Sequence, residues 1–268
     1  MIIHNFDPVL IDFGFIQIRW YSIAYIAGII LGWLYAIRII KKTLTKHNVL
    51  LVDVKYFDDL IIYLVFGIVI GGRLGYVFFY DLNYFIENYI EILKIWKGGM
   101  SFHGGLLGVI IATLIFAKNN KTNFFNLADI ISCVAPIGLF MGRMANFING
   151  ELIGKTTSLP WGVIFPAEGN LPRHPSQLYE AFLEGLLLFV LINYLALKKN
   201  FLLKTGYISA LFLIFYSIAR IIGEYFREPD VHLGYLFNFF SMGSLLSLIT
   251  FIFGCIIIFI INKNEQNN

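Results

Sequence analysis

A short stretch near the middle of the chain places an arginine, two asparagines and a glutamate at the end of an apolar run. Residues 142–154 read GRMANFINGELIG, and the apolar run begins near Leu127. Arg143 and Asn146 are three residues apart, so they share one face of a helix. An ionisable group at membrane depth costs about 2.5–3.5 kcal/mol on insertion scales, so it marks a functional site or an interhelical salt bridge.

A histidine followed by two glycines opens a second apolar run, at His103, Gly104 and Gly105. At a helix start, an imidazole lies beside uncovered backbone N–H groups, which together with the helix dipole favour an anion. Histidine is also the side chain most easily poised as a proton acceptor near neutral pH. The same pattern suits a histidine hydrogen-bonded in a tight helix crossing, and the residues alone leave both interpretations open.

A third apolar run carries Tyr216, Arg220 and Glu224 at a spacing of four, with Arg227 three residues further on. Residues at this spacing form one stripe of a helix, and in a membrane the stripe must face protein or a polar cavity. We expect Arg220 and Glu224 to pair within the helix, which would orient the guanidinium group.

Further polar residues stand near the ends of other apolar runs. Arg73 follows two glycines, Tyr21 opens the first run, and His174 precedes Pro175, which suits a first helical turn. Asp129 is alone in its run, and we expect it to be a structural hydrogen-bond partner.

The sequence contains no Ser-His-Asp order, HExxH motif, P-loop or paired Cys/His spacing. Cys133 and Cys255 both lie in apolar runs, so we expect two buried thiols that behave as small hydrophobic groups. We therefore expect a site without metal or cofactor, built from arginines, a histidine and one or two glutamates. Such a site suits a lipid whose phosphate-bearing headgroup leaves as an anion.

The composition indicates a membrane protein. The chain is 58% hydrophobic and 14% charged, whereas soluble domains are about 45–50% apolar and 25% charged. Several runs reach the roughly 20 residues needed to cross hydrocarbon. We predict an all-α polytopic protein with a small outer head segment at residues 149–173. Its single membrane domain, residues 1–268, would have seven transmembrane helices, at about residues 18–40, 57–80, 100–118, 125–147, 175–197, 206–226 and 236–261.

The lysines predict the orientation of these spans. Alternate loops carry Lys41, Lys42, Lys46, Lys55, Lys118, Lys121, Lys198, Lys199, Lys204 and Lys263, against only Lys94, Lys97 and Lys155 on the other side. The positive-inside rule then places the N-terminus outside and the C-terminus in the cytoplasm. Lysines scattered over short loops give no sign of a nucleic-acid partner.

Six arginines behave differently from the lysines, since they lie near the outer ends of spans: Arg19, Arg73, Arg143, Arg173, Arg220 and Arg227. Arginine binds phosphate or carboxylate through two parallel hydrogen bonds, so this grouping predicts an anionic ligand. The alternative is a set of side chains that reach outer-leaflet headgroups, which we accept for Arg19 and keep open for Arg173.

Four blocks together resemble the phosphatidylglycerol–prolipoprotein diacylglyceryl transferase family. They read GMSFHGGL at residues 99–106, GRMANFINGE at 142–151, RHPSQLYE at 173–180 and RIIGEYFREPD at 220–230. The blocks occur in the family's order and span most of the chain. The resemblance implies a multi-pass enzyme of the bacterial cytoplasmic (inner) membrane, with seven spans and an outward N-terminus.

The resemblance also implies the reaction. Diacylglycerol moves from phosphatidylglycerol to the lipobox cysteine thiol of a prolipoprotein signal peptide, which forms a thioether and releases glycerol 1-phosphate. Arg143 and Arg220 would face the phosphate. His103 is the family's candidate base, and the sequence does not settle whether it or another group takes the proton. The other residues that match the family's needs, as binding or orienting groups, are Tyr21, Asn146, Glu151, Gly154 and Glu224.

We add Tyr216, Arg73 and His174 to the expected substrate-binding residues, and membrane lipids to the expected partners. Two other classes of protein also fit midplane arginines. A transporter of organic anions predicts inverted repeats, and none is visible in the sequence. A non-catalytic lipid-binding scaffold would tolerate alanine at Arg143 and His103.

Overall fold

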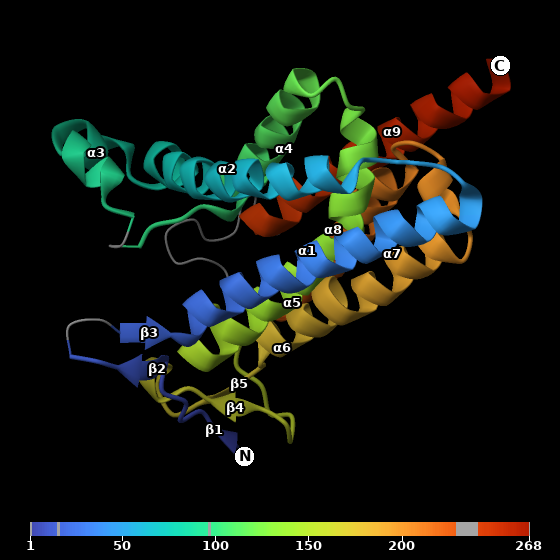
Figure 1. The fold of residues 1–268 in the computed structure, drawn as a ribbon. Coiled ribbons are helices and arrows are strands. Elements are labelled where there is room, and N and C mark those ends of the chain that lie inside the picture. Colours follow the sequence, from blue (N-terminus) through green and yellow to red (C-terminus); the bar gives the residue numbers. More distant parts are fainter. Residues whose placement is uncertain (1, 15–16, 96–97, 229–240, 268) are drawn as a thin grey trace. The chain divides into compact units, whose positions relative to one another are not determined.

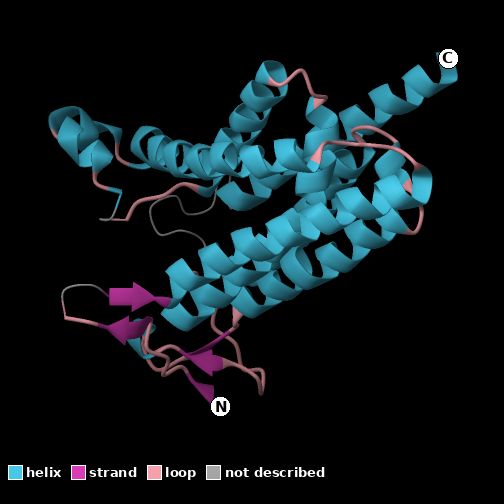
Figure 2. Cartoon of the chain, in the orientation of Figure 1, coloured by secondary structure: helices cyan, strands magenta, loops and turns pink. Residues whose placement is uncertain are grey.

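The computed structural model describes residues 2–14, 17–95, 98–228 and 241–267, and helices dominate it (Figure 1, Figure 2). Six described helices are long and apolar enough to cross a membrane. They are α1 (Trp20–His47), α2 (Val54–Tyr80), α5 (Phe124–Asn149), the continuous run α6–η4–α7 (Ser176–Glu180, Ala181–Leu187, Leu188–Leu197), α8 (Tyr207–Phe226) and α9 (Met242–Asn267). These helices confirm an all-α polytopic membrane protein.

The span expected near residues 100–118 corresponds to α4 (Phe102–Asn119), a shorter apolar helix. The expected start of the last span at residue 236 lies outside the described residues. Short helices connect the long ones: α3 (Leu82–Glu87), η1 (Tyr89–Leu93), η3 (Pro166–Glu168) and η5 (Phe201–Leu203). The count of seven spans and their orientation stay predictions.

Local side chains explain where several helices begin. The Asp53 carboxylate accepts a hydrogen bond from the Lys55 N–H at the start of α2, and Ser101 Oγ accepts one from the Gly104 N–H at the start of α4. Such caps satisfy N–H groups that have no partner within the helix. Asp129 on α5 does the same for α8, because its carboxylate accepts hydrogen bonds from the N–H groups of Gly206 and Ser209, each at 2.7 Å. The expected structural role of Asp129 is confirmed.

The chain divides into two compact units, residues 37–128 and residues 1–36 with 129–268. In the first unit, α2 and α4 cross at glycines. A side chain at Gly71, Gly104 or Gly108 would overlap the backbone of the facing helix. The glycines after His103 therefore serve close helix packing, which was one of the two interpretations of that motif.

In the second unit, α5 contacts its neighbours through small residues. A Cβ atom at Gly28 of α1 would lie 3.2 Å from the Cα atom of Gly138 on α5, and one at Gly185 would lie 2.6 Å from the Cβ atom of Phe140. Figure 1 shows α1 beside α5, and α8 packs against both the α6–η4–α7 run and α9. Three helices that carry charged residues, α5, α6 and α8, are thereby brought together.

The N-terminal residues and the head segment contribute two small sheets that the sequence did not predict. Strand β4 (Val163–Ile164) pairs in parallel with β1 (Ile2–Ile3) and antiparallel with β5 (Pro172–Arg173). Strands β2 (Val9–Asp12) and β3 (Gln17–Arg19) form a hairpin. Each strand has two to four residues, too few to show an alternating pattern. A small core of Ile153, Val163 and Phe165 packs against Phe147 at the end of α5.

One expectation about the cysteines is wrong. Cys133 on α5 is buried, but Cys255 on α9 is exposed. A membrane helix is apolar towards lipid as well as towards protein, so apolar neighbours in the sequence do not show which way a side chain faces.

Candidate active site

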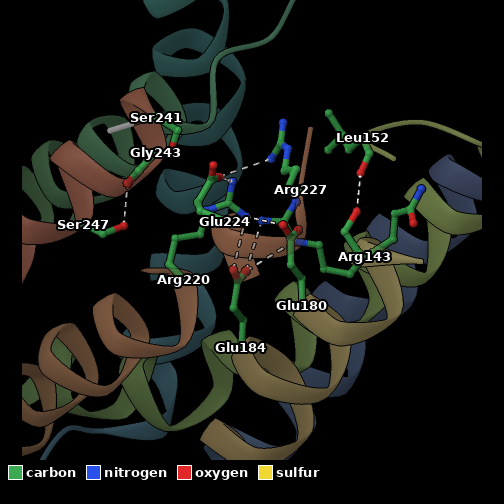
Figure 3. Close-up of polar contacts among 12 residues, drawn as sticks. Arg143, Leu152, Glu180, Glu184, Arg220, Glu224, Arg227, Ser241, Gly243 and Ser247 are labelled. Carbon is green, nitrogen blue, oxygen red and sulfur yellow. Dashed lines mark hydrogen bonds and ion pairs between the residues drawn. The ribbon is translucent and has the colours of Figure 1, made fainter. Parts of the chain in front are cut away.

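Charged side chains from three helices meet in one buried cluster (Figure 3). The ion-pair cluster, as we name it, contains Arg143 of α5, Glu180 of α6, Glu184 of η4, Arg220 and Glu224 of α8, and Arg227 directly after α8. All six residues belong to the same compact unit.

Two glutamates bridge the two arginines that the sequence had singled out. Arg143 Nε lies 3.0 Å from Glu180 Oε2, and Arg143 Nη2 lies 3.1 Å from Glu184 Oε2. Arg220 Nη1 lies 2.9 Å from Glu180 Oε1 and 3.2 Å from Glu184 Oε1. Each carboxylate therefore uses one oxygen for each guanidinium group. Arg143 and Arg220 thus meet in one ion-pair cluster, and phosphate binding by this pair stays a prediction.

The two bridging carboxylates both hold the arginines. Glu184 accepts hydrogen bonds from both Arg143 and Arg220. Both oxygens of Glu180 lie at ion-pair distance from guanidinium nitrogens. Both glutamates thus help to fix the two guanidinium groups.

Arg220 also pairs with Glu224 one turn further along α8, which confirms the predicted pair within the helix. Arg227 Nη1 lies 3.8 Å from the same Glu224 oxygen. The three positive and three negative charges of the cluster cancel. The side chains of Glu180 and Glu184 are 0% exposed, whereas those of Arg143 and Arg220 keep 13% and 10%. The arginines, not the bridging glutamates, offer the cluster's remaining open surface to a ligand.

Glu180 and Glu184 are the site residues that the sequence interpretation missed. Neither residue is among the site residues expected from the sequence. Two carboxylates four residues apart in an apolar run must find cationic partners in a membrane, and this was the available signal. The π-helical turn η4 begins directly after Glu180, and such turns inside helices often occur at functional sites.

Asn146 lies about one turn after Arg143 on α5 and connects the cluster's helix to the following turn. Its Nδ2 donates to Glu151 Oε2 at 3.4 Å, and Glu151 Oε1 accepts from Asn149 at 3.1 Å. The Glu151 carbonyl accepts a 2.6 Å hydrogen bond from Gln177 at the start of α6. The expected residues Asn146 and Glu151 thus lie together, at the junction of α5 and α6.

Gly154 is a backbone junction. Its N–H donates to the His174 carbonyl at 3.1 Å, and it forms an antiparallel bridge with Arg227. A Cβ atom there would lie 2.6 Å from the Cβ atom of His174 and 2.8 Å from the Phe226 carbonyl oxygen. The structure thus gives Gly154 a role in holding the chain on either side of the cluster, next to Arg227.

His174 belongs to an aromatic group that covers the end of α8. Its Nδ1 lies 3.2 Å from Tyr179 Oη, and its ring makes edge contacts with Tyr179 and Phe226. Tyr179 Oη also accepts from Trp161 Nε1 at 2.8 Å. Burial, with a smaller contribution from Lys155, lowers the pKa of His174 below its usual 6.5.

The two expected tyrosines lie in the same compact unit as the ion-pair cluster. Tyr216 is buried one turn before Arg220 on α8 and stacks on Phe212. Tyr21, at the start of α1, accepts a hydrogen bond from Tyr25 Oη at 3.3 Å. The substrate-binding roles of both tyrosines stay predictions.

Arg73 and His103 lie in the unit of residues 37–128. The Arg73 guanidinium donates to four backbone carbonyls, those of Glu91, Ile92, Gly98 and Gly99, at 2.5–3.1 Å. It therefore holds the segment that leads into α4. His103 lies in the first turn of α4. Binding by Arg73 and catalysis by His103 stay predictions.

A comparison with protein families decides what kind of protein carries this cluster. Residues 8–260 match the family described as prolipoprotein diacylglyceryl transferase. The chain belongs to this family.

Curated relatives extend over nearly the whole chain. A protein of Rickettsia bellii (strain OSU 85-389) is 49% identical over 261 residues, which cover 97% of this chain and 96% of the relative. Proteins of Rhodopseudomonas palustris and Rickettsia typhi are 49% and 47% identical, covering 94% and 98% of this chain and 88% and 100% of their own length. All three are named phosphatidylglycerol–prolipoprotein diacylglyceryl transferase. The resemblance seen in the sequence is confirmed, and the protein is a membrane transferase of lipoprotein biosynthesis.

Proposed function

We propose that this protein transfers the diacylglyceryl group of phosphatidylglycerol to the lipobox cysteine of prolipoprotein signal peptides. The observation that supports this proposal most directly is the sharing of two buried carboxylates by Arg143 and Arg220, which come from different helices. This sharing holds two guanidinium groups in one place before any ligand arrives. Preorganised donors of this kind stabilise charge that develops on a departing phosphate.

In the proposed reaction, the thiolate sulfur of the lipobox cysteine attacks the glyceryl carbon that bears the phosphate. The carbon–oxygen bond breaks, and its electron pair leaves with glycerol 1-phosphate. A carbon–sulfur bond forms, so the product is a thioether. The thiol proton must go to a base because the thiolate is the reactive form. His103 is the candidate base that the family resemblance implies.

The ion-pair cluster suits this reaction in its charge. Without a bound ligand, its three glutamates balance the charge of its three arginines, so the arginines need no counter-ion from solution. A phosphate group that approaches their open side adds negative charge next to the guanidinium groups. The buried glutamates keep the planar guanidinium groups oriented while these groups donate hydrogen bonds to the phosphate.

We further propose that the enzyme lies in the bacterial cytoplasmic membrane with seven spans, the N-terminus outside and the C-terminus inside. This orientation rests on the asymmetric distribution of lysine between alternate loops. The ion-pair cluster would then lie near the outer leaflet, where its phosphatidylglycerol substrate and the signal peptide meet.

The direct test uses the purified full-length protein, phosphatidylglycerol micelles and a synthetic lipobox peptide. We expect the peptide mass to increase by one diacylglyceryl group and glycerol 1-phosphate to appear in equal amount. A peptide with serine in place of the lipobox cysteine serves as the control and should remain unmodified. Absence of the thioether product with the cysteine peptide would refute the proposed function.

A further inference from the structure

The first turn of α9 lies directly against the carboxylate of Glu224 (Figure 3). A Cβ atom added to Gly243 would lie 2.5 Å from Glu224 Oε1 and 2.8 Å from its Cδ. Real Cβ atoms do not approach other atoms so closely, so only glycine fits at residue 243 while Glu224 keeps its position.

Hydrogen bonds hold Gly243 in place on α9, and ion pairs hold the Glu224 carboxylate in place on α8. On the α9 side, Ser247 Oγ donates to the Gly243 carbonyl at 2.7 Å, and Ser241 Oγ caps the helix by accepting from the Ser244 N–H at 3.1 Å. On the α8 side, the Glu224 carboxylate pairs with Arg220 and lies within ion-pair distance of Arg227. A displaced Glu224 carboxylate would therefore alter one of the three ion pairs that orient the guanidinium of Arg220.

We propose that Gly243 is a positioning residue for the transfer reaction, because it leaves the space in which Glu224 orients Arg220. This inference rests on the proposed function of the ion-pair cluster. Gly243 itself touches neither substrate. It acts through Glu224, so its loss should change the rate of transfer more than the stability of the fold.

Gly254 supplies a matched control on the same helix pair. A Cβ atom at Gly254 would lie 2.8 Å from Ile214 Cγ1 and 2.9 Å from the Ala210 carbonyl oxygen of α8. The crowding is similar to that at Gly243, but it falls on apolar and backbone atoms about three turns away along α9. Gly254→Ala should therefore lower stability without affecting the orientation of Arg220.

The experiment compares Gly243→Ala, Gly254→Ala, Glu224→Asp and the double variant Gly243→Ala/Glu224→Asp in the peptide transfer assay. We expect Gly243→Ala to lower kcat at least about tenfold, since small displacements of a positioned group are costly. Gly254→Ala should keep kcat within about twofold while lowering Tm by more than Gly243→Ala does. Equal loss of kcat in the two alanine variants would overturn the proposal.

The double variant tests whether Gly243 acts through Glu224. Aspartate is one methylene shorter and withdraws the carboxylate from residue 243. The double variant should be at least about threefold more active than the product of the two single effects, because residues in contact are coupled. Multiplicative effects would show that Gly243 acts by another route.

A spectroscopic measurement separates this inference from the proposed function. In protein labelled with ¹⁵N-arginine, the Nε–Hε signal of Arg220 can be assigned by its loss in Arg220→Lys. We expect this signal to shift in Gly243→Ala and to stay in place in Gly254→Ala. An unmoved signal would refute the positioning role, whereas a wild-type protein without transfer activity would refute the proposed function alone.

Discussion

At the scale of single residues, the ion-pair cluster shows why arginine and glutamate occur together inside a membrane. Arg143 contacts two carboxylates and Arg220 contacts three, and Glu180 and Glu184 are wholly buried. A buried charge is tolerated only when it is paired, so neither residue type could occupy these positions alone. The same pairing orients the planar guanidinium groups, which is the property that phosphate binding requires.

The first prediction concerns the shape of the cation. Arg143→Lys keeps the positive charge but replaces the planar guanidinium group, which can donate two parallel hydrogen bonds, with a compact ammonium group. We expect kcat/KM for peptide transfer to fall about tenfold or more, as for the loss of a preorganised donor. Arg19→Lys, at a position without an expected catalytic role, is the control. Near-normal turnover in Arg143→Lys would argue against phosphate binding by this side chain.

The second prediction concerns the missed glutamates. Glu184→Gln removes a carboxylate that accepts hydrogen bonds from both arginines. Removing one partner of a buried ion pair costs about 3–5 kcal/mol in soluble proteins, so we expect a lower Tm together with a lower kcat. Glu168→Gln alters an exposed carboxylate and should leave both unchanged. A fully active, fully stable Glu184→Gln protein would show that the bridge is dispensable.

At the scale of elements, the head segment determines how the start of α6 and the end of α8 are held. Gly154 bonds to the backbone just before α6 and forms a bridge with Arg227 just after α8. The head segment therefore acts on the ion-pair cluster through the backbone.

The third prediction tests this junction. Gly154→Ala would place a Cβ atom 2.8 Å from the Phe226 carbonyl oxygen, so we expect the end of α8 to shift and both Tm and transfer activity to fall. Gly142→Ala is the control, because a Cβ atom at Gly142 meets nothing within 4 Å. Similar behaviour of the two variants in thermal unfolding and in the transfer assay would contradict the role of Gly154.

The fourth prediction concerns pH. The folded protein lowers the pKa of His174 below 6.5, so below that pH the unfolded chain binds more protons than the folded one. Stability contributed by neutral His174 is therefore present above pH 6.5 and is lost as the pH falls through the folded-state pKa. Thermal unfolding between about pH 5 and 8 should show a smaller decline at low pH in His174→Gln than in the wild type. An identical decline in both proteins would contradict this assignment.

At the scale of the whole molecule, six described helices have the length and composition of membrane spans, and their proposed orientation rests on the lysine pattern. In the proposed orientation, the ion-pair cluster lies near the outer leaflet.

The fifth prediction tests this orientation by labelling. Ser158→Cys in the head segment should react with a membrane-impermeant maleimide added to intact spheroplasts. Lys199→Cys, in the loop after α7, should react only after the membrane is permeabilised. The native Cys133 is buried and should not interfere, and Cys255→Ser removes the exposed native thiol. Labelling of Lys199→Cys in intact cells would reverse the proposed topology.

Much of the architecture is determined by the sequence alone, because hydropathy and helix spacing are local properties. Long apolar runs specify membrane helices wherever they occur, and the Arg220–Glu224 pair follows from a spacing of four on one helix. The family motifs likewise identify the enzyme class directly from the order of their residues.

Only the tertiary structure decided which charges meet. Arg143 is paired with Glu180 and Glu184 because α5 packs against the α6–η4–α7 run, and contacts between helices distant in sequence leave no periodic signal in either one. The same reason explains the exposed Cys255, the backbone junction at Gly154 and the space that Gly243 leaves for Glu224. Each depends on which face of a helix turns towards a neighbour, and apolar composition does not distinguish protein from lipid on that face.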